Sequence, residues 1–309
     1  MPSLHAFAQA TDLRLVVTQP DRRAGRGQHL RATAVKIAAQ ELGIPIIEPE
    51  TLRVPIPELT AQAFDLFAVA SYGKIVPQGL LDLPRFGALN VHPSPLPLYR
   101  GATPLQSQIR DGVTGSGVTI IMMDAGMDTG DIVAQERSEI GETETYGELH
   151  DRFGQLGASL LARAVERLKD GKLARVPQHG LVPADRIAAT LTRPLSKADL
   201  EVNPSWPARR IYNHLRALIP EPLGRIPVPS GMAKVLEVRL ADASELARLG
   251  TGLRTSSWFS TPDLPDALAC VRPDGAVLIS RLIPPNRKAM SAAEYVHALG
   301  RPFVSRAPT

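Results

Sequence analysis

Asn90 and His92 are the residues of this sequence that could most readily do chemistry, because they stand two positions apart at the end of an apolar run over residues 88–91. Side chains two apart on a β-strand point to the same face, so these two would project together. An amide beside an imidazole suits acyl transfer, since the amide can donate to a developing oxyanion while the imidazole moves a proton or adds positive charge. Taken alone, an Asn-x-His pair is more often a turn residue beside a loop histidine, so the pair needs support from other segments.

A second segment, residues 123–131, carries three carboxylates, those of Asp124, Asp128 and Asp131. It lacks the bidentate glutamate that completes a calcium-binding loop, so calcium binding is a poor explanation. A carboxylate in such a glycine-containing loop can instead orient an imidazole and favour its protonated form.

A third segment, residues 21–31, is rich in arginine and glycine. It has neither the glycine spacing of a dinucleotide-binding turn nor that of a P-loop, so a cradle for nucleotide phosphates is not indicated. The remaining interpretations are a solvated loop and a loop that contacts unpaired nucleotides through arginine.

The elements that must position these residues follow from the apolar patterning. Predicted strands of the first part are residues 13–17, 44–47, 66–70, 88–91, 118–123 and 132–135, and predicted helices are residues 1–10, 34–42 and 145–169. The last two strands, residues 118–123 and 132–135, are predicted to pair as in a hairpin, with the chain reversing direction between them. The alternation is typical of an α/β fold with a Rossmann-like, mostly parallel sheet, in which ligands bind at the carboxyl ends of the strands.

The C-terminal part has a different pattern. Periodicity fades before residue 199, where prolines interrupt the sequence, and three apolar segments at 233–240, 267–271 and 276–283 follow a predicted helix at 208–217. Turn-separated strands of this kind suit a small, OB-like β-barrel. We therefore predict a catalytic domain over residues 1–178, a linker over 179–198 and a barrel domain over 199–309.

Composition narrows the class of protein. Of 309 residues, 44% are hydrophobic and 21% charged, which excludes a wholly disordered or collagen-like chain. No apolar stretch approaches the roughly 20 residues that span a bilayer and no signal peptide is evident, so we expect a cytoplasmic protein without a membrane partner. The net charge of +4 resides in residues 199–309, which carry 14 basic and 10 acidic side chains. The single cysteine, Cys270, excludes an internal disulfide or a multi-cysteine zinc site.

Considered together, the segments resemble those of the methionyl-tRNA formyltransferases, a branch of the folate-dependent formyltransferases. The matching blocks occur in order along nearly the whole chain and comprise residues 18–27, 71–77, 90–104, 117–131 and 286–290. The resemblance implies transfer of a formyl group from 10-formyltetrahydrofolate to the α-amino group of methionine on initiator tRNA, without a metal ion. It assigns Asn90 as oxyanion donor, His92 as oxyanion stabiliser or proton shuttle, and Asp128 as the group that orients His92 or a bridging water.

The resemblance also implies two sets of binding residues and a monomeric enzyme. The folate site would comprise Ser71, Tyr72, Gly73, Ile75, Ser94, Pro97, Met123, Asp124 and Gly126. The tRNA contacts would comprise Arg22, Arg23, Arg26, Arg31 and Lys197, with further contacts in the C-terminal barrel domain. Arg26, in Ala-Gly-Arg-Gly, is the foremost of these.

The sequence departs from the family at its start. The family's catalytic domain opens with an apolar strand and a Gly-Ser/Thr-Pro turn, whereas residues 1–10 already read as the first helix. The absent strand would lie inside the sheet and leave an open edge on each neighbour. We expect the upstream DNA to encode it in frame, and the 309-residue form to be unstable without it. Lesser departures are Pro95 and residues 202–206, where Ile-Asp-Trp is more usual.

Two other functions fit part of this pattern. One is a folate formyltransferase that acts on a nucleotide-sugar amine or on glycinamide ribonucleotide, against which the arginine-rich loop and the predicted barrel argue. The other is a tRNA-binding protein without catalytic activity.

Overall fold

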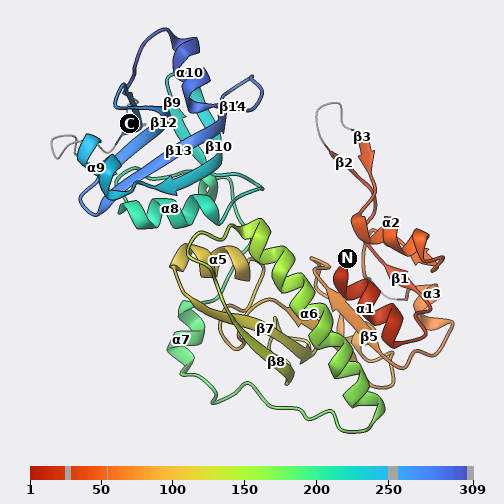
Figure 1. Cartoon of the computed structure of the whole chain (residues 1–309). Coiled ribbons are helices and arrows are strands. Elements are labelled where there is room, and N and C mark those ends of the chain that lie inside the picture. Colours follow the sequence, from red (N-terminus) through yellow and green to blue (C-terminus); the bar gives the residue numbers. More distant parts are fainter. Residues whose placement is uncertain (25–28, 54, 250–256, 305–309) are drawn as a thin grey trace. The chain divides into compact units, whose positions relative to one another are not determined.

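The computed structural model describes residues 1–24, 29–53, 55–249 and 257–304. The chain divides into two compact units (Figure 1). Unit 1 comprises residues 1–104, 115–139 and 151–192, and unit 2 comprises residues 105–114, 140–150 and 193–309. The predicted domain boundaries at residues 178 and 198 remain a prediction from the sequence.

The central sheet of unit 1 has the strand order β5-β6-β7-β8. Its strands are β5 (Phe67–Ala70), β6 (Ala88–His92), β7 (Gly115–Met122) and β8 (Ile132–Glu139). β5 runs parallel to β6, while β7 and β8 are antiparallel to their neighbours. The α/β class is therefore confirmed with a mixed sheet, in which β7 and β8 make the expected hairpin-like return.

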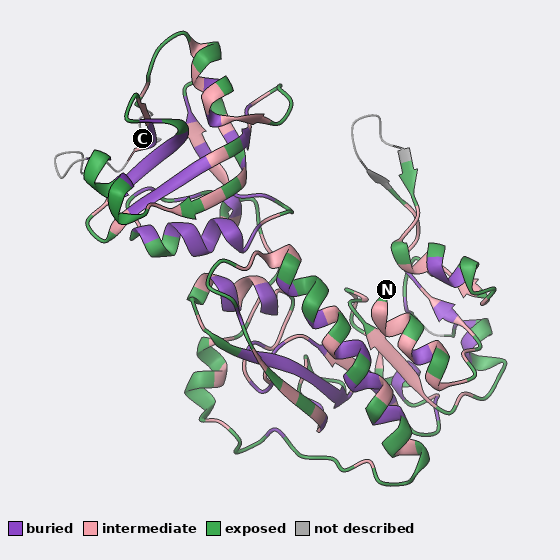
Figure 2. Cartoon of the chain, in the orientation of Figure 1, coloured by how far each residue is buried: buried purple, intermediate pink, exposed green. Residues whose placement is uncertain are grey.

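The long helix α6 (Tyr146–Lys169) covers this sheet. Leu161 and Ala164 pack against Leu89 of β6 and Ile120 of β7 in one buried cluster, and β7 is buried along nearly its whole length (Figure 2). A Cβ on Gly157 would come within 2.6 Å of Val91 Cγ1, so the absence of a side chain lets α6 approach the strand that carries the candidate site.

A second, two-stranded parallel sheet pairs β1 (Val16–Val17) with β4 (Ile46–Ile47). The neighbouring helices of unit 1 are α1 (Pro2–Ala10), α2 (Ala34–Glu41), α3 (Pro57–Thr60) and α4 (Gln78–Leu81), and Phe7 of α1 packs in the same cluster as Leu89 of the central sheet. The Thr33 side chain accepts from the Lys36 amide and caps α2. The hairpin β2 (Arg22–Ala24) and β3 (His29–Arg31) precedes α2.

β1 and β5 are edge strands of these two sheets, and no pairing joins them within the described residues. Leu15, Val17 and Phe67 nevertheless pack in one apolar cluster, and the Gln19 side chain donates to the Tyr72 carbonyl at 3.0 Å. The unpaired edges expected from the sequence are therefore present, with side-chain packing in place of a hydrogen-bonded ladder.

Unit 2 is built on an antiparallel sheet of order β11-β12-β13-β10-β9, with β14 paired to β13. The strands are β9 (Arg225–Val228), β10 (Gly231–Leu240), β11 (Phe259–Thr261), β12 (Leu264–Arg272), β13 (Gly275–Ile283) and β14 (Met290–Ser291). The helices are α5 (Pro104–Asp111), α8 (Ala208–Arg216), α9 (Ala243–Leu249), α10 (Ala292–Leu299) and the 3₁₀ turn η1 (Ala198–Leu200).

The sheet and helices of unit 2 share a buried core. Ile211 and Leu215 of α8 pack with Trp258, Ile279 and Tyr295, and all five side chains are at most 1% exposed. The curled antiparallel sheet agrees with the expected small barrel-like domain. No helix within the described ranges is both long and apolar enough to cross a membrane.

Candidate active site

His92 is the last residue of β6, and its imidazole is only 4% exposed. Its Nε2 lies 3.0 Å from the Tyr99 carbonyl oxygen. A carbonyl oxygen can only accept a hydrogen bond, so Nε2 carries the hydrogen and donates it. In the neutral ring, Nδ1 is therefore the nitrogen with the free lone pair.

Asp128 faces that nitrogen. Its Oδ1 is 3.6 Å from His92 Nδ1, and its Oδ2 accepts from the Gly101 amide at 2.8 Å. Asp128 has a positive φ of 56°, a conformation that non-glycine residues seldom adopt. The loop thus holds the carboxylate where it would stabilise a proton gained at Nδ1.

Burial lowers the pKa of His92 below its ordinary value, because it removes solvation from the imidazolium. The Asp128 carboxylate and the hydrogen bond to Tyr99 oppose this shift, while Arg100 adds to it. Asp128 therefore favours the protonated ring, as expected, but burial outweighs it. The His92 imidazole is neutral near pH 7 and can accept a proton.

Asn90 lies two residues before His92 on β6, paired with Val69 on one side and Ile121 on the other. Its side chain is half-buried and makes no hydrogen bond to any residue in the described ranges. The period of two along a strand places it on the same face as His92. Its amide is thus available to a ligand on that face, in line with the role implied by the resemblance.

Gln178 is a component of this site that the sequence did not identify. Its side chain is 2% exposed, and its Nε2 donates to the carbonyl oxygens of Asp128 at 2.9 Å and Gly130 at 2.7 Å. Its Oε1 accepts from Arg100 Nε at 3.1 Å and Nη2 at 2.8 Å. One amide therefore ties the Asp128 loop to Arg100. Gln178 lies at the end of the predicted catalytic domain, in a segment without periodicity, so no local signal marked it.

Two threonines near the end of unit 1 hold the loop after His92. Thr190 Oγ1 accepts from the Tyr99 amide at 3.2 Å, and the Thr192 amide donates to the Arg100 carbonyl at 2.8 Å. A Cβ on Gly101 would come 2.1 Å from the Thr192 carbonyl oxygen, so only glycine fits there. Part of the predicted linker therefore packs on the site, and its helix α7 (Ala184–Ala189) was not expected.

We expect Gln178→Ala to lower kcat by roughly 10-fold or more, because the carbonyl of Asp128 and the guanidinium of Arg100 would lose a shared buried partner. Gln178→Glu keeps the acceptor for Arg100 but loses both donors to the Asp128 loop, so it should be nearly as impaired. Steady-state rates check this, with exposed Gln155→Ala on α6 as the matched control. Equal activity of Gln178→Glu and the native protein would contradict a positioning role.

The predicted folate segment over residues 71–75 directly follows β5. Ala70 pairs with Val91, so Ser71 leaves the sheet beside His92. Ser71 and Gly73 both have positive φ, of 50° and 75°, and Ile75 is 79% exposed. Burial raises the pKa of Tyr72, whose hydroxyl is enclosed without a hydrogen-bond partner among the described residues.

The other predicted folate residues lie in two loops. Asp124 is exposed, and its carboxylate accepts from the Gly126 amide at 3.0 Å and from Thr129 Oγ1 at 2.7 Å, which shapes the loop after Met123. Ser94 and Pro97 are buried, and Ser94 Oγ donates to the Leu98 carbonyl. Any contribution of Ser94 to binding would thus act through the loop that it holds.

The predicted tRNA residues fall in both units. Arg22 and Arg31 are exposed and pair across the β2–β3 hairpin, whose first strand includes Arg23. Arg26 lies outside the described residues. Lys197 is exposed next to η1 in unit 2. No cluster of three or more His, Cys, Asp or Glu side chains suited to a metal ion occurs in the described part of the chain.

Comparison with protein families and curated sequences gives consistent matches. The family described as formyl transferase matches residues 3–165, and its C-terminal domain matches residues 194–300. The methionyl-tRNA formyltransferase of Xylella fastidiosa (strain M23) is 36% identical over 300 residues, covering 96% of this chain and 94% of that protein. The methionyl-tRNA formyltransferase of Listeria innocua is 35% identical over 304 residues, covering 97% and 93%.

Solved structures share the fold at lower sequence identity. An N-formyltransferase from Helicobacter canadensis, in complex with folinic acid and dTDP-3-aminofucose, has a TM-score of 0.62 and 18% identity, covering 90% of this chain and 93% of that chain. HypX from Aquifex aeolicus in complex with tetrahydrofolic acid has a TM-score of 0.60 and 15% identity, covering 93% and 47%.

Proposed function

Because the chain belongs to the formyl transferase family and matches methionyl-tRNA formyltransferases over nearly its whole length, we propose that it transfers a formyl group from 10-formyltetrahydrofolate to the α-amino group of methionyl initiator tRNA. The observation that carries the proposal is the contact of buried His92, on β6, with Asp128 of the loop between β7 and β8. The same strand β6 carries Asn90, whose side-chain amide has no hydrogen-bond partner among the described residues. The enzyme is proposed to act as a cytoplasmic monomer, with initiator tRNA and the folate as its partners.

The proposed reaction is an acyl transfer. The methionine amine attacks the formyl carbon, a carbon–nitrogen bond forms, and the formyl oxygen gains negative charge that the Asn90 amide stabilises by donating a hydrogen bond. His92 Nδ1 accepts the proton lost by the amine, and Asp128 stabilises the resulting imidazolium across 3.6 Å. The proton then passes to N10 of the folate, the bond from the formyl carbon to N10 breaks, and tetrahydrofolate leaves.

In this proposal the folate lies along the carboxyl end of β5, against the loop over residues 71–75 and the loop after β7. The positive φ angles of Ser71 and Gly73 direct their main-chain N–H and C=O groups away from the hydrogen-bonding pattern between strands. This supports a role of the segment in holding the pterin by main-chain hydrogen bonds. The neighbouring Asn90 would then face the formyl group.

The direct test is to mix the purified protein with 10-formyltetrahydrofolate and methionyl initiator tRNA and to measure formylmethionyl-tRNA. Formation of this product, with no formylation of a nucleotide-sugar amine or of glycinamide ribonucleotide, would establish the substrate. Binding of the tRNA without product would instead favour a non-catalytic tRNA-binding protein.

We expect Arg26→Ala to raise the KM for tRNA far more than the KM for folate, because Arg26 is proposed to contact the tRNA acceptor end. Binding should weaken steeply with salt as the arginine-rich loop displaces counterions from phosphates. Arg26→Lys keeps the charge but not the planar guanidinium group, so its KM for tRNA should lie between that of the native protein and that of Arg26→Ala. Equal changes in both KM values would point to a solvated loop.

A further inference from the structure

Three side chains lie in a row on one face of the central sheet of unit 1. His92 of β6 pairs with Thr119 of β7, and Thr119 pairs in turn with Gln135 of β8. Residues paired directly across neighbouring strands point to the same face of a sheet. The Thr119 side chain, which is 0% exposed, therefore lies next to that of His92, whereas Gln135 is exposed on the edge strand.

The Thr119 hydroxyl holds the loop over residues 93–99. It donates to the Ser94 carbonyl at 2.7 Å and accepts from the Leu96 amide at 3.2 Å. It also accepts from Gln135 Nε2 at 2.8 Å, so its one hydrogen and both of its lone pairs are used. The Gln135 amide donates its second hydrogen to the Leu96 carbonyl at 2.9 Å. Thr119 and Gln135 together therefore fix the main chain of this loop at Ser94 and Leu96.

The same loop carries the carbonyl group that binds the imidazole. Ser94 Oγ donates to the Leu98 carbonyl at 2.7 Å, and the carbonyl of the next residue, Tyr99, accepts from His92 Nε2 at 3.0 Å. The Thr119 hydroxyl is thus connected to the imidazole through Ser94 and the loop. A change that displaces Ser94 should displace the Tyr99 carbonyl as well.

Two acceptors compete for the single hydrogen of the neutral imidazole. The Tyr99 carbonyl, 3.0 Å from Nε2, is within hydrogen-bond distance, whereas Asp128 Oδ1, 3.6 Å from Nδ1, is not. A carboxylate is otherwise the stronger acceptor, so displacement of the Tyr99 carbonyl would favour the tautomer with hydrogen on Nδ1. That tautomer has no lone pair at Nδ1 and could not take the proton of the amine there.

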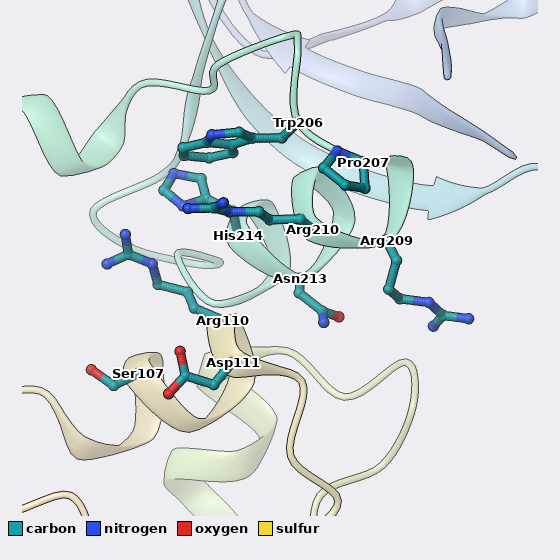
Figure 3. A pocket seen from close by; sticks show the side chains of 9 residues that line it. All are labelled: Ser107, Arg110, Asp111, Trp206, Pro207, Arg209, Arg210, Asn213 and His214. Atoms are coloured by element: carbon teal, nitrogen blue, oxygen red, sulfur yellow. The ribbon is translucent and has the colours of Figure 1, made fainter. Parts of the chain in front are cut away.

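A second buried imidazole, that of His214 on α8, provides a contrast. Its side chain is 2% exposed and packs edge-on against Trp206, with ring centroids 5.2 Å apart (Figure 3). Its Nε2 has no hydrogen-bond partner among the described residues. Burial alone therefore does not give a histidine of this fold an acceptor at Nε2, and His92 differs because the loop supplies one.

We propose that Thr119, supported by Gln135, is a positioning residue that keeps the hydrogen of His92 on Nε2 and so leaves Nδ1 free to act as the base. The use of that base rests on the proposed function. The tautomer itself is a property of the protein without its substrates, and the hydroxyl needs no contact with folate or tRNA for this role.

The test compares Thr119→Val, which keeps the shape of the side chain and removes the hydroxyl, with Thr119→Ser, which keeps the hydroxyl. The tautomer of His92 is read from the ¹⁵N chemical shifts of its imidazole in the full chain without substrates, with the imidazole of His214 as internal reference. We expect a mixture of both tautomers in Thr119→Val. Its kcat should fall by roughly 10-fold, with the KM for tRNA changed by less than about 2-fold. Thr119→Ser should have the native tautomer and most of the native kcat.

Two further variants complete the test. Thr11→Val is the matched control, because Thr11 Oγ1 also donates to a carbonyl oxygen at 2.7 Å, that of Phe7, and should leave the His92 shifts and kcat unchanged. Gln135→Leu removes the amide from the exposed edge strand, where a substitution leaves the core intact. It should move the tautomer in the same direction and lower kcat by roughly 3-fold.

The proposal is overturned if Thr119→Val keeps the native imidazole shifts or, should that variant not fold, if Gln135→Leu keeps them. It is also overturned if Thr119→Val lowers kcat while His92 keeps its native tautomer, since the hydroxyl would then act by another route. Native protein that makes no formylmethionyl-tRNA would instead overturn the proposed function. The imidazole shifts can be measured in either case, so the two failures are distinguishable.

Discussion

His92→Ala should lower kcat/KM for formyl transfer by about 10²–10⁴-fold, the usual contribution of a positioned acid–base group. The reason is that His92 Nδ1 carries the lone pair that can accept the proton, beside Asp128, and no other described imidazole occupies that position. Such a loss corresponds to about 2.7–5.4 kcal/mol of barrier. The protein should still fold, since the change removes one hydrogen bond to Tyr99, a loss of about 1–3 kcal/mol.

The pH profile distinguishes this role from a structural one. Burial sets the pKa of His92 below its ordinary value of 6.5, so native activity should persist below pH 6.5 and decline only as the imidazole gains a proton. Asp128→Asn removes a charge that raises this pKa, and should shift the acid limb to still lower pH. His5→Ala, an exposed histidine on α1, serves as control. Full activity of His92→Ala, or an unchanged acid limb in it, would refute the assignment.

Asn90→Ala should lower kcat by about 10²–10³-fold, the cost of removing one oxyanion donor, which is about 2.7–4 kcal/mol. Its amide has no hydrogen-bond partner among the described residues, so the change breaks no hydrogen bond that the structure describes, and stability should be nearly unchanged. The measurement is the single-turnover rate at saturating folate and tRNA, which excludes weaker substrate binding as the cause.

Asn90→Asp is the sharper variant of the same test. It keeps the size of the side chain but replaces the donor with a carboxylate, which would repel the developing oxyanion. We therefore expect Asn90→Asp to be at least as impaired as Asn90→Ala. If Asn90→Asp retained native activity, Asn90 could not be the oxyanion donor.

These predictions assign different effects to different residues. Substitutions at Asn90 and His92 should change the rate of the chemical step, whereas a substitution at Arg26 should change tRNA affinity and its salt dependence. Gln178 is a third case, because its side chain hydrogen-bonds to Asp128, Gly130 and Arg100 and so holds the Asp128 loop. Its variants should alter kcat without altering the salt dependence of tRNA binding.

The sequence by itself determined the family, the candidate catalytic residues and most elements that carry them. The helix expected over residues 34–42 forms as α2 (Ala34–Glu41), and the one over 145–169 forms as α6 (Tyr146–Lys169). The physical reason is that apolar periodicity and capping are local properties of the chain, which fix an element before its neighbours are known. The period of a strand placed Asn90 and His92 on one face, and the resemblance to the formyltransferases then implied their catalytic roles.

Only the tertiary structure decided which residues hold the site in place and in which protonation state His92 rests. Gln178 meets Asp128 from 50 positions away, and Thr192 meets Arg100 from 92, at distances that no local pattern encodes. The protonation of His92 is likewise a property of the fold, since the sequence provides Asp128, which favours the charged ring, while packing provides the burial that outweighs it. Desolvation depends on what surrounds a group in space, and so it appears only when the chain is folded.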